Sequence, residues 1–412
     1  MFASIILLLI CIVFIVIQLK SRRPKNFPPG PPVWPILGNI LDLSLENPLK
    51  DFERLRKTYG NVYRLVMTDY GSSWKEQRRF ALMNLRNFGM GKDSMEERIH
   101  GEIQYTVDTL EKSIGKSFSP QNMFHNAASN IICQVLFGKR FEYEDETIKT
   151  VVQCFTENAK IANGPWAMIY DSFPLIRSLP LPFRRAFKNV EPGDRSSFSE
   201  AQLTMYILDL HFAGTDTTSN TLLTGFLYLM NYPHVQERCQ QEIDMVLEGK
   251  DQASSEDRNN MPYVQAVIHE FQRVANTVPL SIFHSTTKDT ELNGYSIPKG
   301  TLIIPNLTSV LNEEGQWKFP NEFNPENFLN DQGEFVKPEA FMPFSAGPRM
   351  CLGEGLARME LFLFTVTLLR KFKFIWPEDA GEPDFTPVYG VTLTPKPYRM
   401  KVQLRVSQKI PH

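Results

Sequence analysis

Residues 344–353 read FSAGPRMCLG, and the residues that follow, 354–360, read EGLARME. The stretch holds one cysteine, Cys351, and a lone cysteine is usually a small buried apolar side chain. Here glycines stand four residues before it and two residues after it, at Gly347 and Gly353, and they let the backbone approach something flat and bulky. A helix is expected to begin just after the cysteine, and a helix N-terminus favours a thiolate over a thiol.

The chemistry expected of this cysteine is that of a metal ligand. The chain has five widely spaced cysteines and no Cys-x-x-Cys pair, so neither a disulfide framework nor a structural zinc site is expected. Arg349 lies two residues before Cys351 and suits an acidic group. A thiolate ligand without companion ligands points to heme, where the porphyrin supplies four ligands and the protein one axial thiolate.

The stretch resembles the heme-binding loop of the cytochrome P450 family, Phe-x-x-Gly-x-Arg-x-Cys-x-Gly. It matches all five fixed positions: Phe344, Gly347, Arg349, Cys351 and Gly353. The resemblance covers nearly the whole chain and looks closest to microsomal vertebrate family-2 members, the fatty-acid epoxygenase and xenobiotic-oxidising group. It implies a mainly α fold with a small β part. It also implies heme b as cofactor, Cys351 as the axial ligand of its iron, and monooxygenase activity.

The sequence AGTDTT lies in the middle of the longest predicted helix, 199–231, and resembles the family's oxygen-activation motif. The resemblance makes Asp216 and Thr217 the acid and the hydroxyl that deliver protons. It also places Ala213 against the substrate and gives Gly214 the role of leaving room for dioxygen. From the residues alone, Thr217 would bond back to the helix backbone and Asp216 would be solvated.

Three positions resemble those where the family contacts the heme propionates. Trp74 and Arg78 match the family's Trp-x-x-x-Arg, with both side chains on one helical turn, and His284 follows the sequence PLSIF. The alternative for His284 is a surface or core histidine. The resemblance also places apolar side chains in the substrate cavity, which suit a lipophilic substrate but could simply be core: Val278, Leu280, Ile282 and Val388.

Glu270 and Arg273 resemble the family's Glu-x-x-Arg, whose role is to hold the cysteine loop. Their spacing places both side chains on one helix face, where they can pair, although such pairs are common on helix surfaces. The third partner in the family is basic, but Asn327 occupies that place here. An amide can still form a hydrogen bond, without the strength that a charge adds.

The N-terminal segment is predicted to anchor the protein in a membrane. Residues 1–20 contain an uncharged apolar run of about the length that spans a bilayer, and four basic residues follow between positions 20 and 25. Positive charge stays on the cytosolic side, which predicts a single-pass protein of the endoplasmic reticulum membrane with a cytosolic catalytic domain. Residues 21–36 are predicted to form a basic, Pro-rich hinge, and 37–412 the catalytic domain. The alternative for the first segment is a cleaved signal peptide.

The remaining patterns predict a helix-rich body. A strand is expected at 61–67, a β region at 277–310 with a hairpin at Asn293-Gly294, and a second β-hairpin within 385–405. Helices besides 199–231 are expected at 47–59, 74–87, 94–113, 120–137, 146–161, 234–248, 261–275 and 354–372.

Charge and resemblance together define the expected partners. The chain has 44 basic and 46 acidic residues, which excludes a strongly basic nucleic-acid binder. The resemblance implies NADPH-cytochrome P450 reductase as electron donor and cytochrome b5 as a further candidate. An acidic donor is a candidate partner for a basic cluster, although such clusters are more often solvated surface: Lys75, Arg79, Arg86 and Arg358.

The chain is shorter than typical family members by about 80 residues. Two gaps relative to the family, near 64–73 and 189–198, account for the difference and remove strands and part of the roof of the pocket. Three functions therefore stay open: an active monooxygenase, a truncated and catalytically inactive heme-binding isoform, and an isomerase of lipid peroxides that needs no reductase. The acid–threonine pair speaks against the isomerase.

Overall fold

The computed structural model of the chain describes residues 26–31, 39, 42–44, 47–64, 93–143, 145 and 200–405, with the backbone alone at 93–94 and 200–206. These residues fall into two compact units. The first takes them from Met1–Ser72 and Ile282–Pro305, and the second from Ser73–Asn163, Pro180–Ser281 and Asn306–His412. The predicted anchor, 1–20, lies outside the described residues. None of the helices within those residues combines the length and apolar character needed to cross a bilayer.

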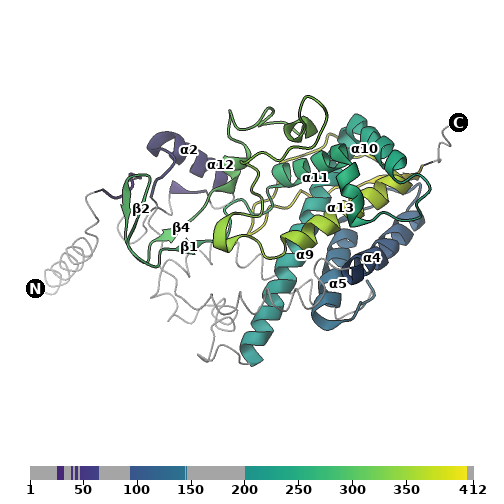
Figure 1. Cartoon of the computed structure of the whole chain (residues 1–412), viewed down its shortest axis with the longest axis horizontal. Helices are drawn as coiled ribbons and strands as arrows, with labels where there is room; N and C mark the ends of the chain where they lie inside the picture. The colour runs from purple at the N-terminus through teal and green to yellow at the C-terminus, as the bar shows by residue number, and fades with distance from the viewer. Residues whose placement is uncertain are drawn as a thin grey trace, which may run out of the picture. The chain divides into compact units, whose positions relative to one another are not determined.

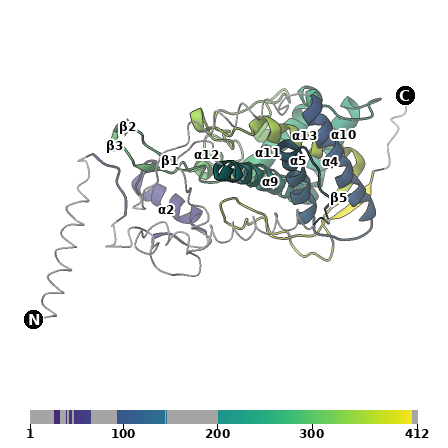
Figure 2. The same ribbon diagram turned by 90° about the horizontal axis from the view of Figure 1, so that it is seen from below.

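Within its described residues, the first unit has one helix and two small antiparallel sheets (Figures 1 and 2). Asn293 and Gly294 join two of the strands with φ angles of 54° and 81°, as a tight hairpin turn with two left-handed residues requires. The predicted hairpin is therefore confirmed. The elements are α2 (Leu49–Tyr59), β1 (His284–Ser285) paired with β4 (Leu302–Ile303), and β2 (Thr290–Leu292) paired with β3 (Tyr295–Ile297).

The predicted strand at 61–67 is wrong over its described part, because residues 61–64 form a bend and irregular backbone. Isolated hydrogen bonds hold this segment instead of a strand ladder. The amide of Arg64 donates to the carbonyl of Pro29 at 2.8 Å, and the hydroxyl of Tyr63 donates to the carbonyl of Phe52 at 3.1 Å. The rest of the range lies outside the described residues.

The second unit is built mainly of helices, and every long one lies within two residues of its predicted bounds. Pro233 and Pro262 open two of them at the position where a missing N–H costs nothing. The helices are α4 (Asp93–Lys112), α5 (Gln121–Phe137), α9 (Glu200–Asn231), α10 (Pro233–Val246), α11 (Pro262–Ala275), α12 (Leu307–Leu311) and α13 (Glu354–Lys371). Short 3-10 turns occur at η3 (Ser255–Asn260), η4 (Pro325–Phe328) and η5 (Gly347–Arg349).

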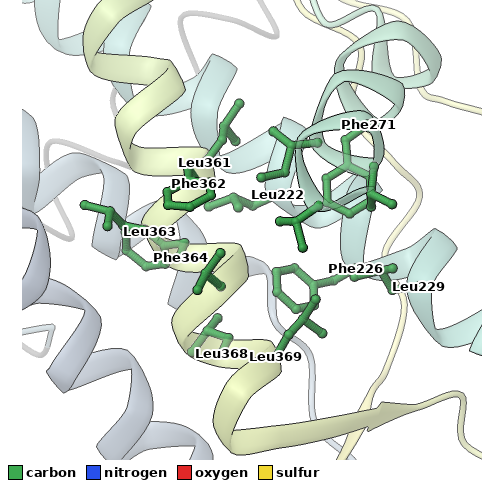
Figure 3. Packing of buried hydrophobic residues seen from close by; sticks show 14 of the residues in the cluster. Leu222, Phe226, Leu229, Phe271, Leu361, Phe362, Leu363, Phe364, Leu368 and Leu369 are labelled. Carbon is green, nitrogen blue, oxygen red and sulfur yellow. The ribbon is translucent and has the colours of Figure 1, made fainter. Parts of the chain in front are cut away.

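The core of the second unit lies where α9, α11 and α13 meet. Figure 3 shows apolar side chains of all three helices gathered in one cluster, including Phe226 of α9, Phe271 of α11 and Phe364 of α13. These three rings are essentially fully buried, and burying a side chain of this size stabilises the fold by about 2–3 kcal/mol. The absence of a side chain at Gly225 lets α9 and α11 approach, because the Phe271 ring fills the space there.

The C-terminal β structure differs from the prediction. β5 (Phe372–Ile375) follows α13 directly and pairs antiparallel with β6 (Lys401–Leu404). Within the fully described range 385–405, the expected hairpin is reduced to one bridge between Val388 and Thr394. Prolines interrupt this stretch and remove backbone donors, so no strand ladder extends from the bridge.

Candidate functional site

Cys351 lies exposed in the loop between η5 and α13. Its backbone N–H donates to the carbonyl of Phe344 at 2.9 Å, which closes the loop. Ser345 and Gly347 have φ angles of 62° and 71°, in the left-handed region that glycine adopts without penalty. α13 begins three residues after the cysteine, at Glu354, so its N-terminus is close enough in sequence to favour a thiolate.

The chemistry of this loop fits an axial heme ligand. The loop offers one exposed thiol, and the described residues contain no group of three or more His, Cys, Asp or Glu side chains arranged to hold a metal ion. A Cβ added at Gly353 would lie 3.9 Å from the sulfur of Cys351, at ordinary contact distance, so the glycine lies directly beside that sulfur. A single exposed thiol suits a macrocycle that already supplies four ligands.

Arg358 of α13 supports the loop from within the protein. Its guanidinium carbon lies 5.2 Å from the centre of the Phe344 ring, and its Nε donates to Glu354 at 2.9 Å. The Nδ1–H of His269 donates to the carbonyl of Gln265 at 2.7 Å, which leaves Nε2 to accept from Arg358 at 2.8 Å. Burial, with the nearby charge of Arg358, lowers the pKa of His269 to about 3. Arg358, expected as a docking cation, is therefore engaged in internal contacts.

Glu270 and Arg273 of α11 form a bidentate ion pair, with both N···O distances 2.7 Å. Both side chains are fully buried, and burial raises the pKa of Glu270 although Arg273 acts against this. The amide of Asn327 donates to the two oxygens of Glu270 at 3.3 and 3.4 Å, and its oxygen accepts from the backbone of Phe319 at 2.9 Å. The guanidinium also donates to the carbonyls of Leu311, Pro320 and Glu322.

These contacts place the three residues expected to hold the loop in one buried network. Asn327 lies in η4, and Glu270 also accepts from the backbone N–H of Asn324 at 2.8 Å. The network fixes the irregular segment 311–328 against α11, and that segment precedes the cysteine loop in the chain. The neutral amide fills its place with hydrogen bonds rather than with a charge.

The two residues expected to deliver protons lie side by side on α9. The hydroxyl of Thr217 donates to the carbonyl of Ala213 at 2.7 Å, the backbone contact that the residues alone favour. Asp216 does not simply face solvent. Its Oδ2 accepts from the hydroxyl of Thr392, and its Oδ1 lies 3.4 Å from Nε2 of His125 on α5.

Gly214 does not leave open room in the structure. The side chain of Ile132 on α5 occupies the space that a Cβ at Gly214 would need. The glycine therefore permits the close approach of α5 and α9, which run alongside each other (Figures 1 and 2). Its neighbour Ala213 is exposed, as a residue facing a substrate space would be.

The sequence does not predict that Glu360 on α13 is a buried acid. Glu360 is 1% exposed, and burial raises its pKa to about 8, although a hydrogen bond with Thr218 of α9 acts against this. Its Oε2 has no hydrogen-bond partner among the described residues. No pattern in the sequence signals this contact, because Glu360 lies on a helix whose sequence reads as ordinary and apolar.

His284 belongs to the first unit, where it lies half-buried in β1. Its Nδ1 is buried and has no hydrogen-bond partner within the described ranges, which fits a nitrogen kept for an acidic ligand group. Cys351 belongs to the second unit. Trp74 and Arg78 lie outside the described residues.

The expected substrate positions differ in exposure. Leu280 is buried and Val278 half-buried in the second unit, whereas Val388 is half exposed. The loop that carries Val388 reaches α9, since Asn220 donates to Thr394 at 3.1 Å. Ile282 is exposed in the first unit. A small hollow in the second unit contains none of these positions and is lined by residues such as Tyr228, Val274, Phe385 and Leu393.

The comparisons with known proteins agree on one family. The model of the cytochrome P450 family matches residues 65–193 and 190–402. Cytochrome P450 2K4 of Oncorhynchus mykiss is 38% identical over 472 residues, covering 94% of each chain. Cytochrome P450 2J2 of Homo sapiens is 37% identical, with 93% of this chain and 92% of the relative covered, and cytochrome P450 2F2 of Rattus norvegicus is 36% identical, with 98% and 99% covered.

Matches of this extent and identity apply to the whole sequence and not only to the cysteine loop. The mainly helical second unit with its small sheet agrees with the expected fold class. The chain therefore belongs to the cytochrome P450 family of heme monooxygenases.

Proposed function

We propose that the protein inserts one oxygen atom from dioxygen into lipophilic substrates, fatty acids such as arachidonic acid and xenobiotics, with electrons from NADPH-cytochrome P450 reductase. The other oxygen atom leaves as water, which consumes two electrons and two protons. The observation that carries the proposal is the exposed thiol of Cys351 in a glycine-flanked loop at the start of α13.

The residues that would hold the heme follow from the family motif. Cys351 would ligate the iron, while Arg349, Trp74, Arg78 and His284 would contact the propionates. A bound heme with a thiolate ligand supplies the activation of dioxygen, because the thiolate donates electron density that favours O–O cleavage. Nδ1 of His284 is buried and has no hydrogen-bond partner among the described residues, which supports its proposed contact with a propionate.

The chain's own contribution to the reaction is the delivery of protons. Asp216 and Thr217 are adjacent on α9, and a carboxyl next to a hydroxyl can transfer protons when both are held in place. The contact between Asp216 and Thr392 fixes that carboxyl. In the structure the hydroxyl of Thr217 donates to the carbonyl of Ala213. To deliver a proton, Thr217 would have to break this hydrogen bond and form another.

Substrate class and location rest on the sequence. The positions expected to line the cavity carry apolar side chains, which supports a lipophilic substrate. The uncharged segment 1–20 with basic residues after it supports attachment to the endoplasmic reticulum membrane, with cytochrome b5 as a further candidate partner.

The proposal is tested with the full chain reconstituted with reductase, NADPH and arachidonic acid under 18O2. We expect oxygenated product that carries one 18O atom, and loss of this product in the Asp216→Asn variant by about a hundredfold. Product that forms without 18O, or without NADPH, would contradict the monooxygenase and favour a peroxide isomerase.

A second candidate, a truncated and catalytically inactive heme-binding isoform, is favoured by the form of the matches. The family model matches in two parts that meet at residues 190–193, and the alignment with cytochrome P450 2K4 runs over more positions than this chain has residues. The meeting point of the two parts supports the proposed gap near 189–198, and the length of the alignment supports the expectation that segments are missing inside this chain. Heme that binds with the thiolate signature but gives no 18O product in the same assay would select this candidate.

A further inference from the structure

His125 of α5 makes two contacts that restrict where its protons can be. Its Nδ1 lies 3.0 Å from the backbone carbonyl of Gln121, and a carbonyl oxygen can only accept. Nδ1 therefore carries a hydrogen and donates it. In the neutral ring, Nε2 is then a bare acceptor, and it lies 3.4 Å from Oδ1 of Asp216 on α9.

Two acceptors at this distance repel each other unless a proton lies between them. The other oxygen of Asp216 already accepts from the hydroxyl of Thr392, which turns Oδ1 toward the ring. The pair is thus satisfied in two states: an imidazolium facing a carboxylate, or a neutral imidazole facing a carboxylic acid. Both states hold the same single proton.

We propose that His125 and Asp216 share one exchangeable proton beside Thr217, and that His125 resupplies Asp216 with protons during the reaction. In the transfer, the Nε2–H bond of the imidazolium breaks and an O–H bond forms at Oδ1. The ring is left neutral with its hydrogen on Nδ1. Water returns the proton to Nε2, since about a fifth of the His125 side chain is exposed. The inference rests on the proposed function, and His125 acts through Asp216.

A second histidine also joins α5 and α9, but its partner differs from that of His125. One turn along α5, Ser129 lies 3.1 Å from Nε2 of His211 on α9. Burial lowers the pKa of His211 to about 4, and Ser129 offers this ring a hydroxyl where Asp216 offers His125 a carboxylate oxygen. The contact joins the two helices.

The first test follows the proton itself in the full chain labelled with 15N-histidine, with the His125 signal assigned from the His125→Asn variant. We expect Nε2 of His125 to bear or share a hydrogen in the wild type. In Asp216→Asn this hydrogen is lost, because the amide can donate to the bare nitrogen. An unchanged Nε2 signal in Asp216→Asn would overturn the proposal without any need for turnover.

The second test measures product formed per NADPH consumed and the solvent deuterium isotope effect on that ratio. We expect His125→Asn to lower the ratio by about tenfold and to enlarge the isotope effect. The matched control is His100→Asn on α4, where the ring lies 3.7 Å from Glu96 of the same helix.

The two proposals fail in different ways. If Asp216→Asn changes the ratio and the isotope effect but His125→Asn behaves like His100→Asn, the role of His125 is refuted and the proposed function stands. If neither variant changes them, the proposed role of Asp216 fails as well, and with it the relay.

Discussion

Glu360 is a buried acid on α13 that touches Thr218 of α9. Burial disfavours its charged form and raises its pKa from 4.5 to about 8. Between these two pH values the folded protein keeps a proton that the unfolded chain releases. Stability therefore falls as the pH rises through this window, by up to about 1.4 kcal/mol per pH unit.

The Glu360→Gln variant is expected to remove this dependence, because the amide does not ionise and can still bond to Thr218. In thermal unfolding from pH 5 to pH 9, the melting temperature of the variant should rise relative to that of the wild type as the pH rises. Glu382→Gln, at an exposed position, is the control and should follow the wild type. Parallel curves for wild type and Glu360→Gln would mean that Glu360 is ionised, or solvated, in the folded protein.

At the residue scale, the sequence predicted the cysteine loop but not its surroundings. Cys351, with its glycines and Arg349, forms a local pattern within ten residues, so it can be recognised without a structure. The contacts of Asp216 with His125 and Thr392 join residues 91 and 176 positions apart, and no local rule relates them. Thr217 shows the opposite case, since its backbone contact follows from helix geometry alone.

The helices of the second unit approach closely where glycine removes a side chain. At Gly225 a Cβ would lie 2.5 Å from a ring carbon of Phe271, next to the base of the ring rather than at its far end. Phe271 is fully buried and stacks on Phe323 with ring centres 6.1 Å apart, so it cannot swing aside. Helix packing at this position outweighs the poor helix propensity of glycine.

Gly225→Ala is therefore expected to destabilise the protein by about 1–3 kcal/mol through overpacking, despite the gain in helix propensity. The matched control is Gly101→Ala on α4, where an added Cβ meets nothing within 4 Å, and which should stabilise by about 0.5–1 kcal/mol. Urea unfolding of both variants measures the difference. Equal stabilisation by both substitutions would show that α9 and α11 do not pack as closely as described.

At the element scale, periodic patterns predicted the helices well because helical contacts are local. The partner of a strand depends on distant residues, and here the prediction was wrong. β6 pairs with β5, 26 or more positions away, rather than with its neighbours in the expected hairpin. The tight turn at Asn293 and Gly294 was predicted correctly because the turn chemistry lies within two residues.

The family model matches the molecule from residue 65 to residue 402, in two parts that meet at residues 190–193. The core of α9, α11 and α13 and the network around Arg273 are complete within the described residues. The described residues therefore include the cysteine loop, the helix that follows it and the buried network expected to hold it. A working pocket requires that the protein, with the proposed gaps, still binds heme through Cys351.

The most direct test of this account is the spectrum of the reduced, full-length protein with carbon monoxide bound. We expect the red-shifted Soret band that gives the family its name, and its loss in the Cys351→Ser variant while the protein stays folded by circular dichroism. A band in the blue-shifted, inactive position in the wild type, or no heme signal in well-expressed protein, would contradict the claim that Cys351 is a thiolate ligand of heme in this chain.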